Sequence, residues 1–261
     1  MMLSNDAVNI LIYYVLSGIS IVLAIPFFYI ITFHSPSALH LYRNTILNLT
    51  IWYYLAVSIN GILIQLLFTR HEGQLCGKYV GLASYFGPAA VFACVIICTI
   101  SCTNAGVSML ICFVFRYVQI SNRSLPTYFQ WFKPSTLCII LHVMSSLIAG
   151  FWTYVFISRT YFFEIYGILH ACFDERNYST AVVISSVAAG CIALASTLIF
   201  CLVLMTIKVL RSAKAFMTKQ TYRLQLLLTV NLVVLMVSPF VFTGVPLAFN
   251  SFCIYCQVIG I

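Results

Sequence analysis

Charged residues are scarce in this sequence, since only 7% of its 261 residues are Asp, Glu, Lys or Arg. Acidic residues are the rarer kind, with five Asp and Glu against thirteen Lys and Arg. The mean hydropathy of +1.05 lies far above the value of a soluble domain with a water-facing surface. The shortage of charge therefore excludes a soluble protein and predicts an integral membrane protein.

The sequence also lacks the motifs of common enzyme and metal chemistries. It has no His-Glu-x-x-His, no nucleophile-elbow serine and no phosphate-binding glycine loop. His142 stands alone in its apolar run, so we expect a packed interior histidine and not a catalytic one. All five acids lie outside the apolar runs, so a proton-coupled transporter would lack its buried carboxylate. We expect no enzyme, no cofactor and no metal site.

Six apolar runs are long enough to cross a membrane, which takes about 20 residues. They cover roughly Ile10 to Phe33, Thr45 to Phe68, Pro88 to Phe115, Thr136 to Ile157, Thr180 to Leu210 and Leu224 to Phe249. Residues 251–261 begin a seventh run, which would rise only about 16 Å as a helix, about half of a full span. We expect one all-α domain over residues 1–261, with six complete membrane helices and a truncated seventh.

The bases gather on one side of the predicted spans. The turns after spans one, three and five contain nine bases and no acid: Arg43, Arg116, Arg123, Lys133, Lys208, Arg211, Lys214, Lys219 and Arg223. The other side has four bases together with all five acids. The positive-inside tendency thus predicts a multi-pass protein with its N-terminus outside. The bases are spread over short membrane turns and do not form one soluble face, so we expect no nucleic-acid partner.

For the bases at the cytoplasmic side, a role in membrane insertion or anchoring and a role in binding a partner both remain open. Arg116, in "CFVFRYVQI", ends the third apolar run, where its long side chain can extend to the headgroups and act as a stop-transfer charge. The segment 208–223 has five bases in sixteen positions, and it can be a membrane-surface anchor or a docking surface for a partner.

Three motifs carry a specific resemblance. "FHSPSALHLYRNTILNLTIW" has Leu47, Asn48 and Trp52 in register, and "FVFRYVQI" supplies Arg-Tyr at the end of the third span. "MTKQTYRLQLLLTVNLVVLMVSPFVFTGVP" has its matching positions at Thr221, Leu224, Gln225, Pro239 and Pro246, although Leu235 replaces a usual glutamine. In these motifs the chain resembles the nematode serpentine chemoreceptors of the Str superfamily, nearest to the Srh and Sri classes.

This resemblance implies a seven-helix, G-protein-coupled-type receptor in the plasma membrane, with a small-molecule ligand and a heterotrimeric G protein as partners. The expected G-protein-facing residues are Arg116, Tyr117, Lys208, Arg211, Lys214, Lys219 and Arg223. Pro239 and Pro246 both break the hydrogen-bond ladder of the sixth span, and we expect a hinge there. Two alternatives remain: a truncated, signalling-inactive family member, and a small multispan transporter.

We expect the ligand between the outer halves of the helices, where a concave apolar pocket can open to the outside. The candidate residues are Ser58, Asn60, Gln65, Tyr85, Phe86, Phe92, Phe240 and Phe242. Since no charge lies within the spans to neutralise a charged compound, the expected ligand is small, neutral and apolar.

Cysteines and sequons give further expectations. Cys76 and Cys172 lie in predicted outer loops, where oxidising conditions favour a disulfide. Asn177 begins the sequon "NYS" in an outer loop and is the candidate glycosylation site. In the third span Ala90, Cys94, Cys98, Cys102 and Gly106 recur every four residues. We expect this stripe to be a close-packing seam of small side chains and not a metal relay.

Overall fold

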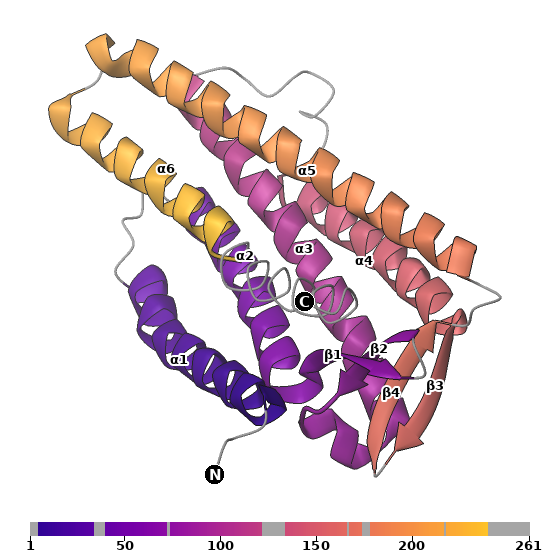
Figure 1. Ribbon diagram of the computed structural model, residues 1–261. Coiled ribbons are helices and arrows are strands. Elements are labelled where there is room, and N and C mark those ends of the chain that lie inside the picture. Colours follow the sequence, from indigo (N-terminus) through magenta and orange to yellow (C-terminus); the bar gives the residue numbers. More distant parts are fainter. Residues whose placement is uncertain are drawn as a thin grey trace, which may run out of the picture.

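The computed structural model describes residues 5–33, 40–71, 74–121, 134–165, 167–173, 178–216 and 218–239. Within these residues the chain is mainly helical, with a small β-sheet at one end of the helices (Figure 1). The α-helices are α1 (Asn5–Phe33), α2 (His40–Ser58), α3 (Pro88–Ser121), α4 (Pro134–Ser158), α5 (Tyr178–Ala213) and α6 (Lys219–Pro239). The short helices are the π-helix η2 (Ile59–Ile64) and the 3₁₀ helices η3 (Leu82–Phe86) and η6 (Lys214–Phe216).

Five helices in the described residues are long and apolar enough to cross a membrane. These spans are Ala7–Phe33, Arg43–Ile64, Pro88–Val118, Thr136–Ser158 and Ala193–Ala213. They overlap the first five predicted spans, so the predicted fold class, a helical membrane bundle, is confirmed. α6 begins where the sixth span was expected, but its described residues end at Pro239. The count of six complete spans and a partial seventh therefore stays a prediction.

α3 runs between the other helices and makes the largest helix contacts with α2, α4 and α5 (Figure 1). Toward its C-terminal end it packs in a hydrophobic cluster that we call the α6 core. This core joins α2, α3, α5 and α6, and its buried members are Leu49, Met109, Cys112, Phe113, Ile199, Val203 and Leu232. The α6 core therefore fixes one end of the bundle.

A four-stranded antiparallel sheet covers the other end of α3. Its strands are β1 (Leu66–His71) and β2 (Gln74–Tyr79), between α2 and α3, and β3 (Thr160–Ile165) and β4 (Ile168–Phe173), between α4 and α5. The strand order β1-β2-β4-β3 puts the two hairpins edge to edge. At the seam between β2 and β4, Cys76 lies directly opposite Cys172, and a disulfide joins them.

This sheet was not predicted, and it adds two β-hairpins to the predominantly helical fold that was expected. A search for apolar runs of about 20 residues passes over strands of six residues. The signal was nevertheless present, because "TYFFEI" is rich in aromatic and β-branched residues and only two positions separate it from β4. Gly167, one of those two positions, has a φ of 76°, which a hairpin turn requires.

The sheet packs on the helices through a second hydrophobic cluster, the sheet core. Its buried members are Ile59, Ile64, Tyr79, Ala83, Val91, Leu169 and Ala171, from η2, β2, η3, α3 and β4. Cross-strand pairing sets Tyr79 opposite Leu169, so both side chains lie on the face of the sheet that meets the helices. Burial in this core raises the pKa of the Tyr79 phenol.

The second span ends earlier than predicted. Its helical part stops at Ile64, and Leu66 already belongs to β1, so the expected boundary at Phe68 is wrong. The reason is Gln65, whose φ of 41° is left-handed and cannot continue a helix. Its backbone C=O accepts a hydrogen bond from Val80 N–H at 3.3 Å, and the Ile64 C=O accepts one from Gly81 N–H at 3.1 Å.

Replacement of Gly81 by Ala is expected to destabilise this junction. A Cβ on Gly81 would lie 2.3 Å from the backbone oxygen of Leu63, so the backbone must shift, at a typical cost of about 1–3 kcal/mol. Gly106→Ala in α3 is the matched control, because nothing lies within 4 Å of a Cβ there. Thermal unfolding of both purified variants measures the difference. Equal melting temperatures would contradict the close packing of η2 against Gly81.

Candidate functional site

Arg116 is buried at the end of α3 that carries the α6 core. Its exposed fraction is 0%, and its Nη2 donates a hydrogen bond to the backbone C=O of Gln225 in α6 at 2.7 Å. Arg116 follows Cys112 and Phe113 by one helical turn, so it closes the α6 core on the same face of α3. The side chain therefore points into the bundle and does not extend to the headgroups as the stop-transfer interpretation expected.

The hydrogen bond of Arg116 ties α3 to the first half of α6. Gln225 contributes only its backbone oxygen, which also accepts a hydrogen bond from the Thr229 hydroxyl at 2.9 Å. The Gln225 side chain adds a buried Oε1 with no hydrogen-bond partner in the described residues. No acid occurs in α3 or α6, so neither of these helices supplies a carboxylate to the guanidinium.

The other predicted G-protein-facing residues lie at the same end of the bundle. Tyr117 is half-buried beside Arg116. The five bases of segment 208–223, which we call the basic turn, are all exposed: Lys208, Arg211, Lys214, Lys219 and Arg223. Lys214 Nζ lies 5.8 Å from the centre of the Tyr222 ring, within the range of a cation–π contact. The structure thus brings these predicted residues to one end.

A polar network lies between α2, α3 and α4, near the middle of the bundle. Asn48 Nδ2 lies 2.8 Å from both the Ser108 hydroxyl and His142 Nε2, and Ser108 Oγ lies 3.0 Å from the same His142 nitrogen. Trp52 donates its indole N–H to Asn48 Oδ1 at 3.2 Å. The expectation of a packed interior histidine fits this environment, but His142 is not alone.

Asn104 extends this network by one turn along α3. Its Nδ2 donates to the Ser146 hydroxyl at 2.9 Å, and its Oδ1 accepts from the Ser145 hydroxyl. Asn104 and Ser108 are four residues apart, as are His142 and Ser146, so each pair shares one helix face. This spacing was the signal that could have revealed the network from the sequence.

The predicted ligand residues do not form one pocket in the described part of the chain. Gln65 is fully buried next to the sheet core, where its Nε2 donates to the Gly61 C=O at 2.8 Å. Phe92 packs edge-to-face on Phe162 of β3, with the ring centres 4.5 Å apart. Tyr85 and Phe86, by contrast, are each 82% exposed on η3. Asn60 is half-buried within η2.

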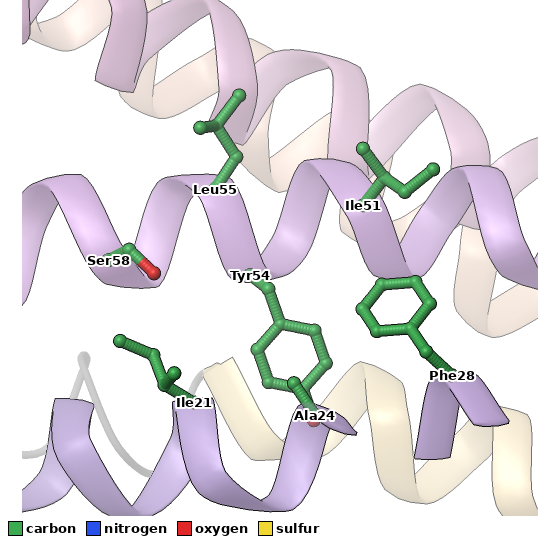
Figure 2. A pocket seen from close by; sticks show the side chains of 7 residues that line it. All are labelled: Ile21, Ala24, Phe28, Ile51, Tyr54, Leu55 and Ser58. Atoms are coloured by element: carbon green, nitrogen blue, oxygen red, sulfur yellow. The ribbon is translucent and has the colours of Figure 1, made fainter. Parts of the chain in front are cut away.

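Ser58 faces a different space, an apolar groove between α1 and α2 (Figure 2). The groove has a volume of about 320 Å³, and its lining residues are Ile21, Ala24, Phe28, Ile51, Tyr54, Leu55 and Ser58. Figure 2 shows the Tyr54 and Phe28 rings between the two helices, with Ser58 toward one end. Several lining side chains, including Ile51 and Leu55, are exposed on the apolar surface of the helices.

The remaining predictions concern cysteines and the end of the chain. Cys98 Sγ lies 3.9 Å from the Ala56 C=O of α2, and Cys94 and Cys98 border the sheet core. In the described residues no group of three His, Cys, Asp or Glu side chains could hold a metal ion. Pro239 is the final residue of α6. Asn177, Phe240, Phe242 and Pro246 lie outside the described residues.

The sequence matches the family described as serpentine type 7TM GPCR chemoreceptor Srh over residues 4–259. The chain belongs to this family. The match covers nearly the whole chain and includes every described element, so the resemblance in the three motifs is confirmed at the level of the family. No curated protein matches the chain.

The Asn48–His142 contact is expected to contribute to stability as a pair. Interhelical hydrogen bonds in membrane proteins show coupling energies of roughly 0.6 to 1.7 kcal/mol. A double-mutant cycle with Asn48→Ala and His142→Ala, measured by unfolding in detergent, should give a coupling in that range. Asn48→Ala combined with Ser20→Ala serves as the control, because the Ser20 hydroxyl donates to the Leu16 C=O of its own helix and, among the described residues, has no hydrogen bond to α2 or α4. Additive effects in the first cycle would contradict the network.

Proposed function

We propose that this chemoreceptor binds a small, neutral, apolar compound in the half of the bundle nearest the sheet and signals to a heterotrimeric G protein at the opposite end. The observation that carries the proposal is the buried Arg116, hydrogen-bonded to the α6 backbone at 2.7 Å. In this arrangement α6 covers the arginine that the family motif provides. A change that moves α6 away from α3 makes the guanidinium accessible to a partner.

The energy of this contact is suited to control by a ligand. A hydrogen bond that involves a charged group contributes about 1.5–3 kcal/mol. A coupling free energy between two sites is typically about 1–3 kcal/mol. A ligand that prefers the open arrangement by that amount is therefore sufficient to release Arg116 from the Gln225 carbonyl. In the proposal Pro239 and Pro246 provide the bend about which α6 moves, and Arg116 and Tyr117 contact the G protein.

The two ends of the bundle support the proposed orientation in the plasma membrane. The Cys76–Cys172 disulfide lies in the sheet, and disulfides persist in oxidising compartments. The basic turn lies at the other end of the helices, which agrees with the positive-inside tendency. α1 begins at the same end as the sheet (Figure 1), so the N-terminus is proposed to be outside.

The chemistry of the sheet end supports a neutral ligand. The sheet core and the hydrophobic side chains packed on it provide an apolar surface at this end of the bundle. Ser58, Asn60 and Gln65 are uncharged polar groups that can fix the orientation of a compound by hydrogen bonds. Phe92, which packs on the sheet core, provides an aromatic side chain at the same end of the bundle.

Epitope tags test the orientation directly. We expect a tag at the N-terminus to be labelled by antibody on intact cells, because that end is proposed to face outside. A tag between Arg211 and Lys219 should be labelled only after permeabilisation. The reverse pattern would refute the assignment of both ends.

Arg116→Ala is expected to reduce G-protein activation at least tenfold per receptor at the cell surface. Insertion should change little, because Arg123 and Lys133 still mark the cytoplasmic side. The measurement is nucleotide exchange on the G protein in response to a panel of neutral, apolar odorants, normalised to surface expression. Arg116→Lys is the matched variant, since it keeps the charge but loses the planar guanidinium. Lower surface expression with unchanged signalling per receptor would instead support the stop-transfer interpretation.

A further inference from the structure

Bases of the basic turn lie on the same faces of α5 and α6 as exposed apolar side chains. In α5, Lys208 lies one turn after Leu204, which is 51% exposed, so both side chains lie on the same face of the helix. In α6, Arg223 lies one turn before Leu227, which is 58% exposed. Exposed apolar side chains on membrane helices contact lipid tails, so the bases on the same faces stand where the headgroups begin.

The opposite faces of the same two helices are buried. Thr206 and Leu210 of α5 point inward, next to the exposed Lys208. In α6, Thr229 and Leu232, which follow Arg223 in sequence, are also buried and point inward. The bases therefore lie on the lipid side of α5 and α6, and Arg116 lies on the bundle side. A partner that enters between the helices meets Arg116 first, whereas a lipid headgroup meets the basic turn.

One side-chain contact joins the two halves of the basic turn. The cation–π contact of Lys214 with Tyr222 joins the turn after α5 to the first turn of α6. Tyr222 is adjacent to Arg223, and Lys219 lies one turn before Arg223 on the same face. None of the five acids of the sequence falls within α5, η6 or α6, so no carboxylate of these elements neutralises the cluster.

We propose that the basic turn is a binding site for the phosphate groups of anionic lipids in the membrane leaflet at this end of the bundle. Lys208, Arg211, Lys214, Lys219 and Arg223 provide the cations, and the Lys214–Tyr222 contact holds the two helix ends together so that one headgroup reaches several of them. This inference goes beyond the proposed receptor function and does not depend on it, because the site requires neither odorant nor G protein. Lipid bound there also contacts the end of α6 that carries Gln225.

Because several bases contribute to the site, the proposal predicts tighter binding of lipids whose headgroups carry several phosphates, and weaker binding when bases are removed. Each base near an anionic surface contributes about 1 kcal/mol, which corresponds to about a fivefold change in affinity. Removal of two bases should weaken binding about thirtyfold. Removal of the Tyr222 ring leaves every charge in place and should weaken binding only about two- to fivefold, the effect of losing one cation–π contact.

The experiment uses the full chain in phosphatidylcholine nanodiscs that contain phosphatidylinositol bisphosphate, with retained lipid measured by native mass spectrometry. Lys208→Gln with Arg223→Gln should lower retention about thirtyfold. Lys78→Gln with Arg159→Gln is the matched control, because it removes the same two charges from the sheet end. Tyr222→Leu should lower retention by the smaller factor. Thermal unfolding of each variant in phosphatidylcholine alone verifies that it is folded.

The possible results separate the lipid from other occupants. Equal retention by the two double variants would overturn the proposal, because binding would then follow net charge and not this site. Soluble inositol trisphosphate that binds as tightly as the lipid would show that free phosphate compounds are the ligand, and would also overturn it. Unchanged retention together with a loss of G-protein activation in Lys208→Gln with Arg223→Gln would assign the bases to the protein partner. Loss of retention with normal activation would support the lipid site alone.

Discussion

The packing of α3 against two separate hydrophobic cores is the constraint on which the rest of the arrangement depends. At one end α3 contributes Met109, Cys112 and Phe113 to the α6 core, and at the other it contributes Val91 to the sheet core. The polar network of Asn104 and Ser108 with α4 lies between them. In a bilayer the helices gain little from hydrophobic association, so close packing and interhelical hydrogen bonds must hold them together. α3 supplies both over its whole length.

Different kinds of interaction stabilise the two ends of the bundle. The sheet end is held by backbone ladders, a disulfide and an apolar core, all of which are insensitive to small charge changes. The α6 end combines an apolar core with a buried guanidinium and a cluster of exposed bases. Interactions of charged groups respond strongly to the local environment, to lipid composition and to partners. The α6 end is accordingly the part of the molecule that the surroundings can influence most.

The sequence predicted the membrane helices well, because their signal is strong and local. Residue runs such as Pro88 to Phe115 and Thr136 to Ile157 fall within α3 and α4, and three short motifs were sufficient to recognise the family. Apart from the pairing of Cys76 with Cys172, contacts between distant segments were not predicted. The four strands are too short to stand out in hydropathy, and the pairing of β2 with β4 joins segments as much as 96 positions apart. The burial of Arg116 likewise depends on α6, more than 100 residues later, and a boundary arginine read alone favours an exposed position.

The disulfide between Cys76 and Cys172 has a topological consequence for the whole molecule. It closes a covalent ring over a sequence separation of 96 residues, and that ring contains η3, α3, α4, β3 and most of β2 and β4. α3 and α4 are thus linked to each other at the sheet end through the bond as well as through the chain. α5 and α6 follow the ring in sequence, and their only covalent connection to it runs through β4. The disulfide itself therefore does not restrict displacement of α5 and α6, which carry the basic turn and the backbone oxygen that accepts the hydrogen bond of Arg116.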